Sequence, residues 1–474
     1  MTDPVSTANP GRRAVLLGVH LQGVTEEEFD SSLAELRRLG KTLGLEIIGR
    51  VTQRRPRLAP GVVVGEGKLV ELAAWTGGSG KVHVGPPQKR RAAEAADAQE
   101  AEREIAAAAE EGGNGAPPAA GVPEKKAAVV LVDHDLSPSQ ARNLERATGA
   151  EVIDRTGLIL AIFQRHARSR AARLQVEIAR LRYLAPRLRE TGIGKDREGG
   201  GIGGRGAGES TAQLDRRKVR DRISELRHEL VAIEHESGTR RRRRAAMSKV
   251  ALVGYTNAGK SSWMRALTGS DVLVQDKLFA TLDTTVRALD PASTPRILVS
   301  DTVGFIKRLP HDLVASFRST LDEARECDLL VQVVDASDAA FPAQIEVTRE
   351  VLDSIGANES PRLLVLNKAD RLDAESRERL LREWPGALMM SVRDPADVAR
   401  LRTALVAHFE HGFEEAEMLV PYALARVVAE AHASVNVLEE SHGPEGTLLR
   451  VRAAPAAIAA LRASLARTPA GESR

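Results

Sequence analysis

Apolar runs alternate with amphipathic stretches over the first 160 residues of the chain. Four runs rich in Val, Leu and Ile have the composition of strands: Arg13–Leu21, Leu45–Val51, Ala127–Val132 and Glu151–Ile153. Between them, apolar residues recur three and four positions apart, as on one face of a helix, for example from Thr25 to about Gly40. Strands alternating with helices predict a small α/β domain over residues 11–160, preceded by disordered residues 1–10.

The composition changes sharply between residues 76 and 126. This stretch is rich in Ala, Glu, Gly and Pro and lacks apolar anchors, so it predicts a flexible insertion in the first domain. Just before it, Gly65–Lys68 reads Gly-Glu-Gly-Lys at a predicted strand-to-helix turn. Short glycine motifs often arise by chance, so we interpret this one as a turn rather than as a phosphate site.

Two longer amphipathic stretches follow, and they predict helices from about Thr156 to Arg189 and from Thr211 to Glu236. Their apolar residues recur at alternating spacings of three and four: Leu174, Ile178, Leu181, Ala185 and Leu188, then Val219, Ile223, Leu226, Leu230 and Ile233. The joining segment, residues 192–208, has nine glycines in seventeen residues and cannot form a core. The pattern predicts an antiparallel helical hairpin over residues 161–238 with a glycine-rich tip. Two separate core helices are the alternative.

The second half of the chain repeats the alternation of strands and helices. Apolar strand-like runs occur at Val250–Val253, Arg296–Ser300, Leu363–Leu366 and Ala387–Met390. They predict a further α/β domain over residues 248–411. An Arg-rich linker at 239–247 precedes it, and it either binds phosphate or is a solvated hinge. Beyond it, Pro421–Glu439 predicts a helix and Thr447–Val451 a strand, which suggests a small α/β domain over residues 412–474.

Composition adds an uneven distribution of charge to this picture. The 474 residues suffice for about three domains, and the net charge is only +3. Residues 165–244, however, carry 22 Lys and Arg against 11 Asp and Glu, which leaves the rest of the chain at −8. A basic segment in an otherwise acidic chain suggests a polyanionic partner. Aromatic residues make up only 3%, so base stacking is not expected to be the main way of binding RNA.

Several classes of protein are disfavoured. No apolar run approaches the length of a membrane span, and the first residues lack the features of a signal peptide. Cys327 is the only cysteine, so no disulfide can form within one chain, which fits a reducing cytoplasm. We expect Cys327 to be a small buried residue, and His134 to be a turn residue rather than a metal ligand.

The strongest chemical signal is a glycine-rich segment between the predicted strand Val250–Val253 and a predicted helix. Such a turn at a helix N-terminus lets backbone N–H groups close around phosphates. Lys260 can reach the β- and γ-phosphates, and the Ser261 hydroxyl is placed to ligate Mg²⁺. The predicted nucleotide contacts are Gly254, Tyr255, Thr256, Asn257, Ala258, Gly259, Lys260 and Ser261.

A second polar segment follows the strand Arg296–Ser300. An acidic residue at this strand end can hold Mg²⁺ directly or through water, and Gly304 lets its backbone N–H approach the γ-phosphate. The segment therefore adds four predicted nucleotide contacts: Asp301, Thr302, Val303 and Gly304.

Two further segments indicate which base is bound. The carboxylate of Asp370 can accept two N–H bonds from guanine, which adenine cannot supply, and the stem of Lys368 can cover one face of the base. After the next strand, a backbone N–H can meet the guanine oxygen. The predicted base contacts are Asn367, Lys368, Ala369, Asp370, Ser391, Val392 and Arg393.

These four segments resemble the G1, G3, G4 and G5 motifs of the translation-factor-like P-loop GTPases. Between the first two, residues 279–285 resemble switch I of the Obg–HflX superfamily. The resemblance assigns Thr281 to Mg²⁺ and the γ-phosphate, and gives catalytic roles to Lys260, Thr281 and Gly304. On its own, Thr281 reads as a polar loop residue. The resemblance adds Phe279, Ala280, Thr281, Leu282 and Asp283 to the nucleotide site, and makes Ser261, Thr281 and Asp301 the Mg²⁺ ligands.

Two positions depart from the commoner pattern. Many GTPases carry a Gln that orients the attacking water, and this chain has Phe305 at that position. The HflX family also has a hydrophobic residue there. A phenyl ring cannot hydrogen-bond to water as an amide does. We therefore expect slow intrinsic hydrolysis unless a partner or another residue orders the water. Val392 replaces a small residue usual in the fifth motif, which leaves the exact base contact open.

The resemblance to the HflX family covers most of residues 11–75 and 127–411. Beyond the GTPase motifs it rests on Ile153–Leu160, Leu174–Glu177 and, less closely, Gly199–Ser210. It implies a GTPase domain preceded by a small α/β domain and a helical hairpin and followed by a small C-terminal α/β domain.

The resemblance also implies a function: a cytoplasmic, monomeric GTPase with Mg²⁺ that binds the large ribosomal subunit and its rRNA, and splits or rescues stalled or idle ribosomes. A peripheral membrane fraction is left open. The basic residues beside the glycine-rich tip would then contact RNA phosphates: Arg182, Arg187, Arg189, Arg216, Arg217, Lys218, Arg220 and Arg222. The alternative is that these basic residues form only the solvated charged surface of a coiled coil.

Two other functions are compatible with the residues. The chain could be a GTP-gated regulator of a protein partner, with the hairpin docking a protein instead of RNA. It could also be an ATPase, although the predicted contact of Asp370 with guanine argues against ATP.

Overall fold

The computed structural model describes residues 11–59, 61–82, 126–188, 211–243, 247–270, 278–279, 285–291, 293, 296–307, 318–357 and 359–466. The chain divides into two compact units, with the boundary between Ala161 and Ile162 in the sequence. The disordered N-terminus, most of the flexible insertion, the glycine-rich tip and Ala280–Asp283 were predictions that lie outside the described residues.

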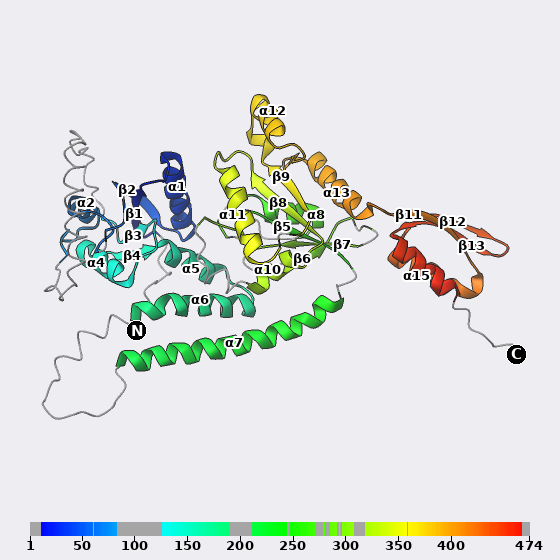
Figure 1. Cartoon of the computed structure of the whole chain (residues 1–474), viewed down its shortest axis with the longest axis horizontal. Helices are drawn as coiled ribbons and strands as arrows, with labels where there is room; N and C mark the ends of the chain where they lie inside the picture. Colours follow the sequence, from blue (N-terminus) through cyan, green and yellow to red (C-terminus); the bar gives the residue numbers. More distant parts are fainter. Residues whose placement is uncertain are drawn as a thin grey trace. The chain divides into compact units, whose positions relative to one another are not determined.

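The first unit contains a parallel sheet in the order β2-β1-β3-β4 (Figure 1). Its strands are β1 (Arg13–Leu21), β2 (Glu46–Arg55), β3 (Val129–Val132) and β4 (Glu151–Asp154), and its helices are α1 (Glu26–Thr42), α2 (Glu66–Thr76) and α4 (Pro138–Thr148). Capping boxes at Thr25 and Ser137 fix where α1 and α4 begin. The four predicted strands and the helix predicted from Thr25 are confirmed, but the residues before Gly65 form only an isolated bridge between Ala59 and Val63 and not the predicted strand.

Ordered structure continues past residue 76, where composition predicted the insertion to begin. Val82 packs against the core of the first unit, and the Gly80 N–H donates to the Ala147 oxygen at 2.9 Å. The expected boundary lies too early because a single apolar residue such as Val82 does not register in a compositional window.

A buried ionic cluster marks the start of α5 (Arg155–His166), directly after β4. The Arg155 guanidinium is 2% exposed, donates to Asp133 at 2.7 Å and also pairs with Glu35 of α1. Without Arg155, two buried carboxylates would lose the charge that compensates them, so the pairing holds α1 and α5 to the sheet.

The single helix predicted over Thr156–Arg189 is wrong, because α5 is followed by a separate helix, α6 (Arg170–Leu188). Between them, the Ser169 hydroxyl accepts the Ala172 N–H at 3.0 Å, as an N-cap does. Apolar periodicity on both sides of the break concealed the cap.

The predicted helical hairpin is confirmed in its described part, and two separate core helices are excluded. Figure 1 shows α6 beside α7 (Thr211–Arg243), and Leu174, Ile178 and Leu226 are buried between them. Ion pairs join Arg170 to Glu229 and Arg222 to Glu177, so the numbering rises on one helix as it falls on the other. The helices are therefore antiparallel.

The Arg-rich linker predicted at 239–247 is wrong in its first part. The helix α7 extends to Arg243, so the first four arginines of the run at 240–244 are helical. Arginine is a good helix former, and no proline interrupts this stretch.

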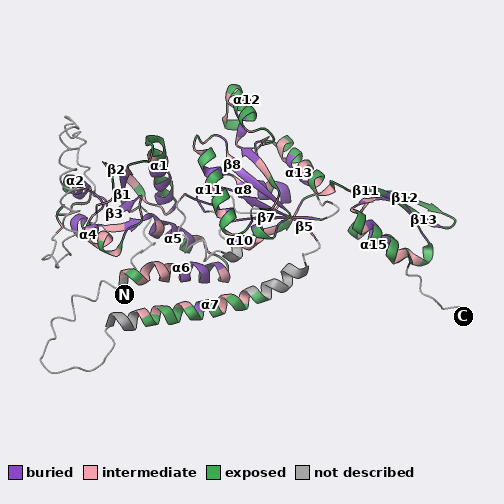
Figure 2. Cartoon of the chain, in the orientation of Figure 1, coloured by how far each residue is buried: buried purple, intermediate pink, exposed green. Residues whose placement is uncertain are grey.

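The second half of the chain forms a six-stranded sheet in the order β10-β9-β8-β5-β7-β6, in which only β6 is antiparallel to its neighbour. Its strands are β5 (Ser248–Val253), β6 (Thr285–Ala288), β7 (Ile297–Asp301), β8 (Leu329–Asp335), β9 (Arg362–Asn367) and β10 (Leu388–Met389). Figure 2 shows the strands of this sheet as largely buried. A mostly parallel sheet of this kind needs helices on both faces.

Alternate residues of the strands face two separate cores. On one face they pack against α8 (Lys260–Thr268) and α13 (Pro395–Glu410), through Trp263 and Leu401 among others. On the other face they pack against α10 (Arg318–Arg325), α11 (Phe341–Ser354) and α12 (Ala374–Glu383). Cys327 belongs to the second core, where burial raises the pKa of its thiol to about 11, so its predicted role as a buried residue is confirmed.

The last part of the chain is an antiparallel sheet in the order β11-β13-β12 with two helices. The strands are β11 (Glu414–Val420), β12 (Asn436–Gly443) and β13 (Gly446–Ala453), and the helices are α14 (Ala425–Ser434) and α15 (Pro455–Ala466). The helix predicted over Pro421–Glu439 is wrong beyond Ser434, because Val435 turns extended and Val437 pairs with Val451. Pairing with a distant strand overrides the local pattern.

Candidate functional site

The segments that carry the predicted chemistry meet at one edge of the six-stranded sheet. The glycine-rich loop joins β5 to α8, Asp301 ends β7, Asn367 ends β9, and Ser391 follows β10. Because these strands are parallel, their carboxyl ends share one edge, where ligands of such folds bind. Residues up to 137 positions apart in the chain are thereby brought to one site.

Asn367 ties the glycine-rich loop to the two segments predicted to bind the base. Its amide is fully buried, donates to the Ala258 oxygen at 2.7 Å and accepts the Val392 N–H at 3.3 Å. Gly259 has φ +103, and a Cβ there would collide with the Asn367 amide. Glycine is therefore required for this close approach.

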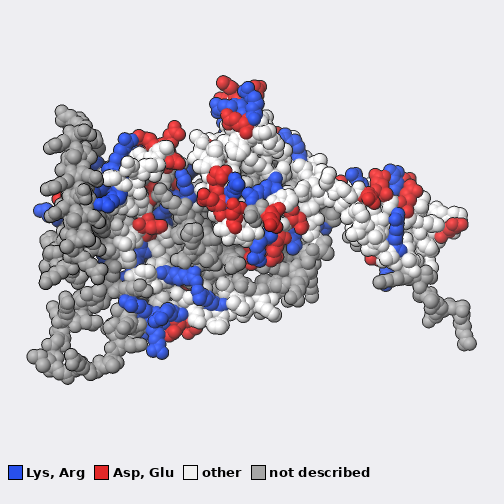
Figure 3. Space-filling view, in the orientation of Figure 1, with Lys and Arg blue, Asp and Glu red and all other residues white. Residues whose placement is uncertain are grey.

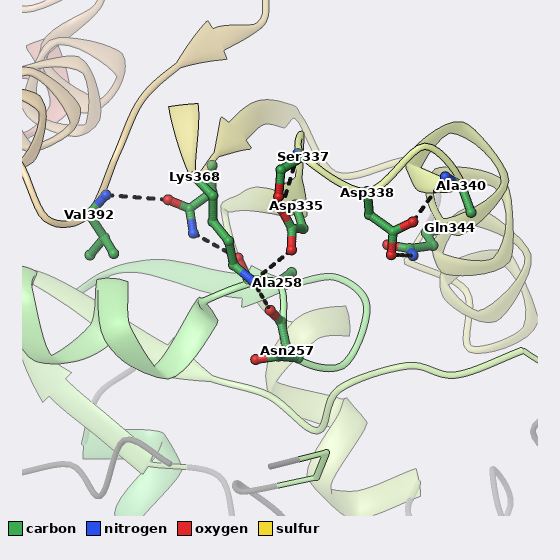
Figure 4. A network of polar contacts seen from close by, with 10 residues as sticks. Asn257, Ala258, Asp335, Ser337, Asp338, Ala340, Gln344, Lys368 and Val392 are labelled. Atoms are coloured by element: carbon green, nitrogen blue, oxygen red, sulfur yellow. Dashed lines mark hydrogen bonds and ion pairs between the residues drawn. The ribbon is translucent and has the colours of Figure 1, made fainter. Parts of the chain in front are cut away.

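Two groups hold the Lys368 side chain in place. Its ammonium donates to the Asn257 oxygen at 2.9 Å and to the Asp335 carboxylate at 2.6 Å (Figure 4). The second carboxylate oxygen of Asp335 accepts the N–H and the hydroxyl of Ser337. This arrangement fixes the lysine stem, which the sequence predicted to cover the base.

Asp335 is a site residue that sequence reasoning missed. It ends β8, the central strand between β5 and β9, so it reaches the same edge as the recognised segments. The signal that could have found it is a polar residue directly after the apolar run Leu329–Val334.

Neighbouring side chains hold Asp370, the predicted base-binding carboxylate, in place. The Ser391 hydroxyl donates to Asp370 at 2.6 Å, and the Arg393 guanidinium lies 3.4 Å from its other oxygen. The Ser391 hydrogen bond is the main cause that lowers the pKa of Asp370, so this exposed carboxyl is ionised at neutral pH. An ionised carboxylate is the acceptor that the two guanine N–H groups require.

At the phosphate end, Lys260 is turned onto its own loop. Its ammonium is buried and donates to the oxygens of Gly254 and Tyr255 at 3.0 and 2.9 Å. Burial lowers the pKa of Lys260 to about 8, and the nearby Asp301 carboxylate opposes that shift.

Ser261 and Asp301 form a ligand pair of the kind that suits Mg²⁺. The Ser261 hydroxyl donates to Asp301 at 2.6 Å, and Asp301 is fully buried. Hydroxyl and carboxylate oxygens are hard ligands, and Mg²⁺ commonly takes only one or two of them, completing its shell with water and substrate phosphate. Within the described ranges no group of three or more His, Cys, Asp or Glu side chains could hold a metal.

The segment after β7 is hydrogen-bonded to the glycine-rich loop. The Thr256 N–H donates to the Phe305 oxygen at 2.8 Å, and the Phe305 N–H donates to the Gly254 oxygen at 3.1 Å. The Tyr255 hydroxyl accepts the Lys307 N–H at 2.7 Å. The two segments therefore move together unless these bonds break.

The Phe305 side chain is not part of the phosphate site. It is 1% exposed and packs in the core beneath α10 and α11, with Leu321 and Leu352 in the same cluster. Thr302 is likewise buried, with its hydroxyl on the Leu252 oxygen at 2.8 Å.

Of the predicted switch I, residues 279–285, only Phe279 and Thr285 are described, and Thr285 is the first residue of β6. Phe279 has φ +57 and is 2% exposed, and its ring lies edge-on to Phe163 with the centroids 4.6 Å apart. Its ring is thus used in packing. Ala280, Thr281, Leu282 and Asp283 lie outside the described residues.

Comparison with known proteins gives the family. Residues 30–83 and 117–164 match the family described as GTP-binding GTPase N-terminal, residues 166–244 the GTP-binding GTPase Middle Region, and residues 249–368 the 50S ribosome-binding GTPase. A GTPase HflX of Gluconacetobacter diazotrophicus is 54% identical over 470 residues, which cover 98% of this chain and 100% of that relative. The chain belongs to the HflX family.

Other HflX relatives agree over most of their length. GTPase HflX of Caldanaerobacter subterraneus subsp. tengcongensis is 35% identical over 93% of this chain and 90% of its own. GTPase HflX of Escherichia coli K12 is 39% identical over 83% of this chain and 82% of its own. The chain is thus a P-loop GTPase that binds and hydrolyses GTP, and the ATPase alternative is set aside. Within the described residues, no helix has the length and apolarity needed to cross a membrane.

Proposed function

We propose that the chain is a GTP-controlled factor that binds the large ribosomal subunit and splits or rescues stalled or idle ribosomes. The observation that carries this proposal is the basic, exposed surface of the antiparallel hairpin. Arg217, Lys218, Arg220 and Arg222 are all exposed on α7. Lys and Arg side chains gather over the described part of the hairpin in Figure 3. Such side chains supply sequence-independent affinity for RNA phosphates.

The family match supports the choice of partner. The 50S ribosome-binding GTPase family covers residues 249–368, which include the glycine-rich loop and the Asp301 segment. In our proposal, the GTPase domain sets when binding occurs and the hairpin supplies the contact with rRNA.

The nucleotide site has the groups for a switch of this kind. We propose that Lys260 leaves the main-chain oxygens of its loop to bind the β- and γ-phosphates when GTP enters. Mg²⁺, held by Ser261, Thr281 and Asp301, would offset the phosphate charge. The Gly304 N–H would bind the γ-phosphate, so that the Asp301–Gly304 segment is ordered with GTP and released after hydrolysis.

The base end has a complementary role. We propose that Asp370 accepts the two guanine N–H bonds, that Lys368 covers one face of the ring, and that the main chain at Ser391–Arg393 meets the guanine oxygen. Asn367 and Ala369 hold these segments together, because Asn367 binds the loop and the Ala369 N–H donates to the Met390 oxygen.

Co-sedimentation with purified large ribosomal subunits tests the proposal. We expect retention to be greater with a GTP analogue than with GDP or no nucleotide, because GTP and ribosome binding must favour one another equally. Retention should fall steeply between low and physiological salt, since each neutralised phosphate releases counterions.

A charge-neutralised hairpin provides the matched comparison. Replacing Arg217, Lys218 and Arg220 with Gln should weaken retention and flatten its salt dependence. Replacing Arg349 of α11 and Arg379 and Arg382 of α12 with Gln removes three exposed positive charges elsewhere and should leave retention unchanged. Equal retention in all nucleotide states, with indifference to salt and to the hairpin variant, would overturn the proposal in favour of a protein partner.

A further inference from the structure

One hydroxyl in the phosphate site has no hydrogen-bond partner among the described residues. Thr256 lies in the glycine-rich loop and is 7% exposed, and its Oγ1 is buried without a hydrogen bond. Buried polar groups are almost always paired in native proteins, so an unpaired one in a ligand site requires an explanation.

Three other hydroxyls among the described residues around the phosphate site already have hydrogen-bond partners. Tyr255 accepts a main-chain N–H of the segment after β7, Ser261 donates to Asp301, and Thr302 donates to a main-chain oxygen of β5. Among these four hydroxyls, that of Thr256 alone keeps its full capacity of one donor and two acceptor positions.

Thr256 stands beside the segment where other GTPases carry the water-orienting side chain. A Cβ built on Gly304 would lie 2.9 Å from the Thr256 Cγ2 and 3.1 Å from the Lys260 Nζ. The Thr256 N–H is bonded to the Phe305 oxygen, so the two residues are adjacent across the site. Rotating χ1 by about 120° moves Oγ1 into the place that Cγ2 now takes, and Cγ2 into the third staggered position.

The Phe305 side chain does not orient the attacking water. Its ring is committed to the core beneath α10, so residue 305 presents only backbone to the phosphate loop. A hydroxyl supplied from the opposite side, at Thr256, is placed to do what the amide of a Gln does elsewhere.

We propose that Thr256 is a catalytic residue for GTP hydrolysis, in which its hydroxyl donates to a γ-phosphoryl oxygen and accepts a hydrogen bond from the attacking water. The water oxygen forms a bond to the γ-phosphorus while the bond from that phosphorus to the β,γ-bridging oxygen breaks. The electron pair of the broken bond stays with GDP, and the proton of the water passes to the released phosphate. Thr256 orients the water and is not consumed.

Two substitutions separate the hydroxyl from the shape of the side chain. Thr256→Val keeps the volume and loses the hydroxyl, whereas Thr256→Ser keeps the hydroxyl and loses the methyl group. In single-turnover hydrolysis without ribosomes, we expect Thr256→Val to be slower by about a hundredfold, the range seen when one transition-state hydrogen bond is lost. Thr256→Ser should stay within about threefold of the unaltered chain.

Nucleotide binding gives a second readout that a merely structural role would not reproduce. GDP has no γ-phosphate, so its affinity should be the same within about twofold for all three proteins. The complex with GDP and aluminium fluoride, which imitates the group in transfer, should be weakened in Thr256→Val alone. Thr348→Val in α11 removes a buried hydroxyl outside the site and should leave both readouts unchanged.

The proposal is overturned if Thr256→Val hydrolyses GTP at the unaltered rate. It is equally overturned if Val and Ser lose the rate together, or if GDP affinity falls as much as the rate does. None of these outcomes depends on ribosome binding, so the test is independent of the proposed cellular role.

Discussion

The two ends of the nucleotide site differ in how completely they are built. At the base end, Asp370 is held by Ser391, and Lys368 by Asp335 and the main chain of Asn257, in bonds compatible with a bound guanine. At the phosphate end, Lys260 is bonded to main-chain oxygens of its own loop, which in our proposal it leaves in order to bind phosphate.

The contrast assigns recognition of the nucleotide to the base end and hydrolysis to the phosphate end. A preorganised base end gives selectivity at little cost in ordering on binding. A lysine that exchanges partners at the phosphate end would tie GTP binding to a change in conformation, as a switch requires. Three predictions can break or sharpen this distinction.

The largest effect is expected at the base end. Asp370→Asn removes the acceptor for two guanine N–H groups, and unpaired polar groups in a specific site are rejected strongly, so GDP affinity should fall by about a thousandfold. Affinity for xanthosine diphosphate should rise, because its ring carries an oxygen that the Asn amide can donate to. Equilibrium titration with fluorescent nucleotides measures both.

Asp373→Asn is the matched control for this prediction. Asp373 caps α12 by accepting the Ser376 N–H at 2.7 Å and lies three positions from Asp370. GDP affinity should stay within about twofold in this variant. Equal affinities for GDP in the two variants would show that the base is not read by Asp370.

The next effect concerns stability rather than binding. Phe305→Gln would bury an amide in the core beneath α10, which should lower the free energy of unfolding by about 3 kcal/mol without accelerating hydrolysis. Phe305→Leu keeps the site apolar and should cost about 1 kcal/mol. Urea unfolding of the full chain and single-turnover assays measure the two properties. Faster hydrolysis by the Gln variant at unchanged stability would show that residue 305 can reach the phosphates.

The smallest effect is a pH dependence confined to the phosphate end. Free Lys260 has a pKa lowered by burial to about 8, and bound phosphates would favour its charged form. The complex then holds a proton that the free protein loses above pH 8. GDP affinity should therefore be constant near pH 7 and fall by up to about tenfold per pH unit above pH 8.

Proton uptake checks this directly, by calorimetric titration in two buffers of different ionisation enthalpy. The base end should contribute no slope, because the lowered pKa of Asp370 keeps its carboxyl ionised over this range. A flat profile from pH 7 to 9 would mean that Lys260 is already charged in the free protein.

The order of the amino acids was sufficient for features that depend on neighbouring residues. The helix that starts after Thr25, the apolar strands and the seam of Leu174, Ile178 and Leu226 follow from spacing within a few turns or one strand. The motif segments also follow, because each comes directly after a strand that the apolar pattern reveals.

Other features required the folded chain. The strand β12 forms because Val437 meets Val451, and Asp335 joins the site because parallel strands end at one edge. Phe305 is removed from the phosphates by packing beneath α10, and Thr256 is brought beside Gly304 by hydrogen bonds between distant segments. Local periodicity carries no information about which distant residues will meet, because those contacts arise only when separate elements pack and their buried polar groups find partners.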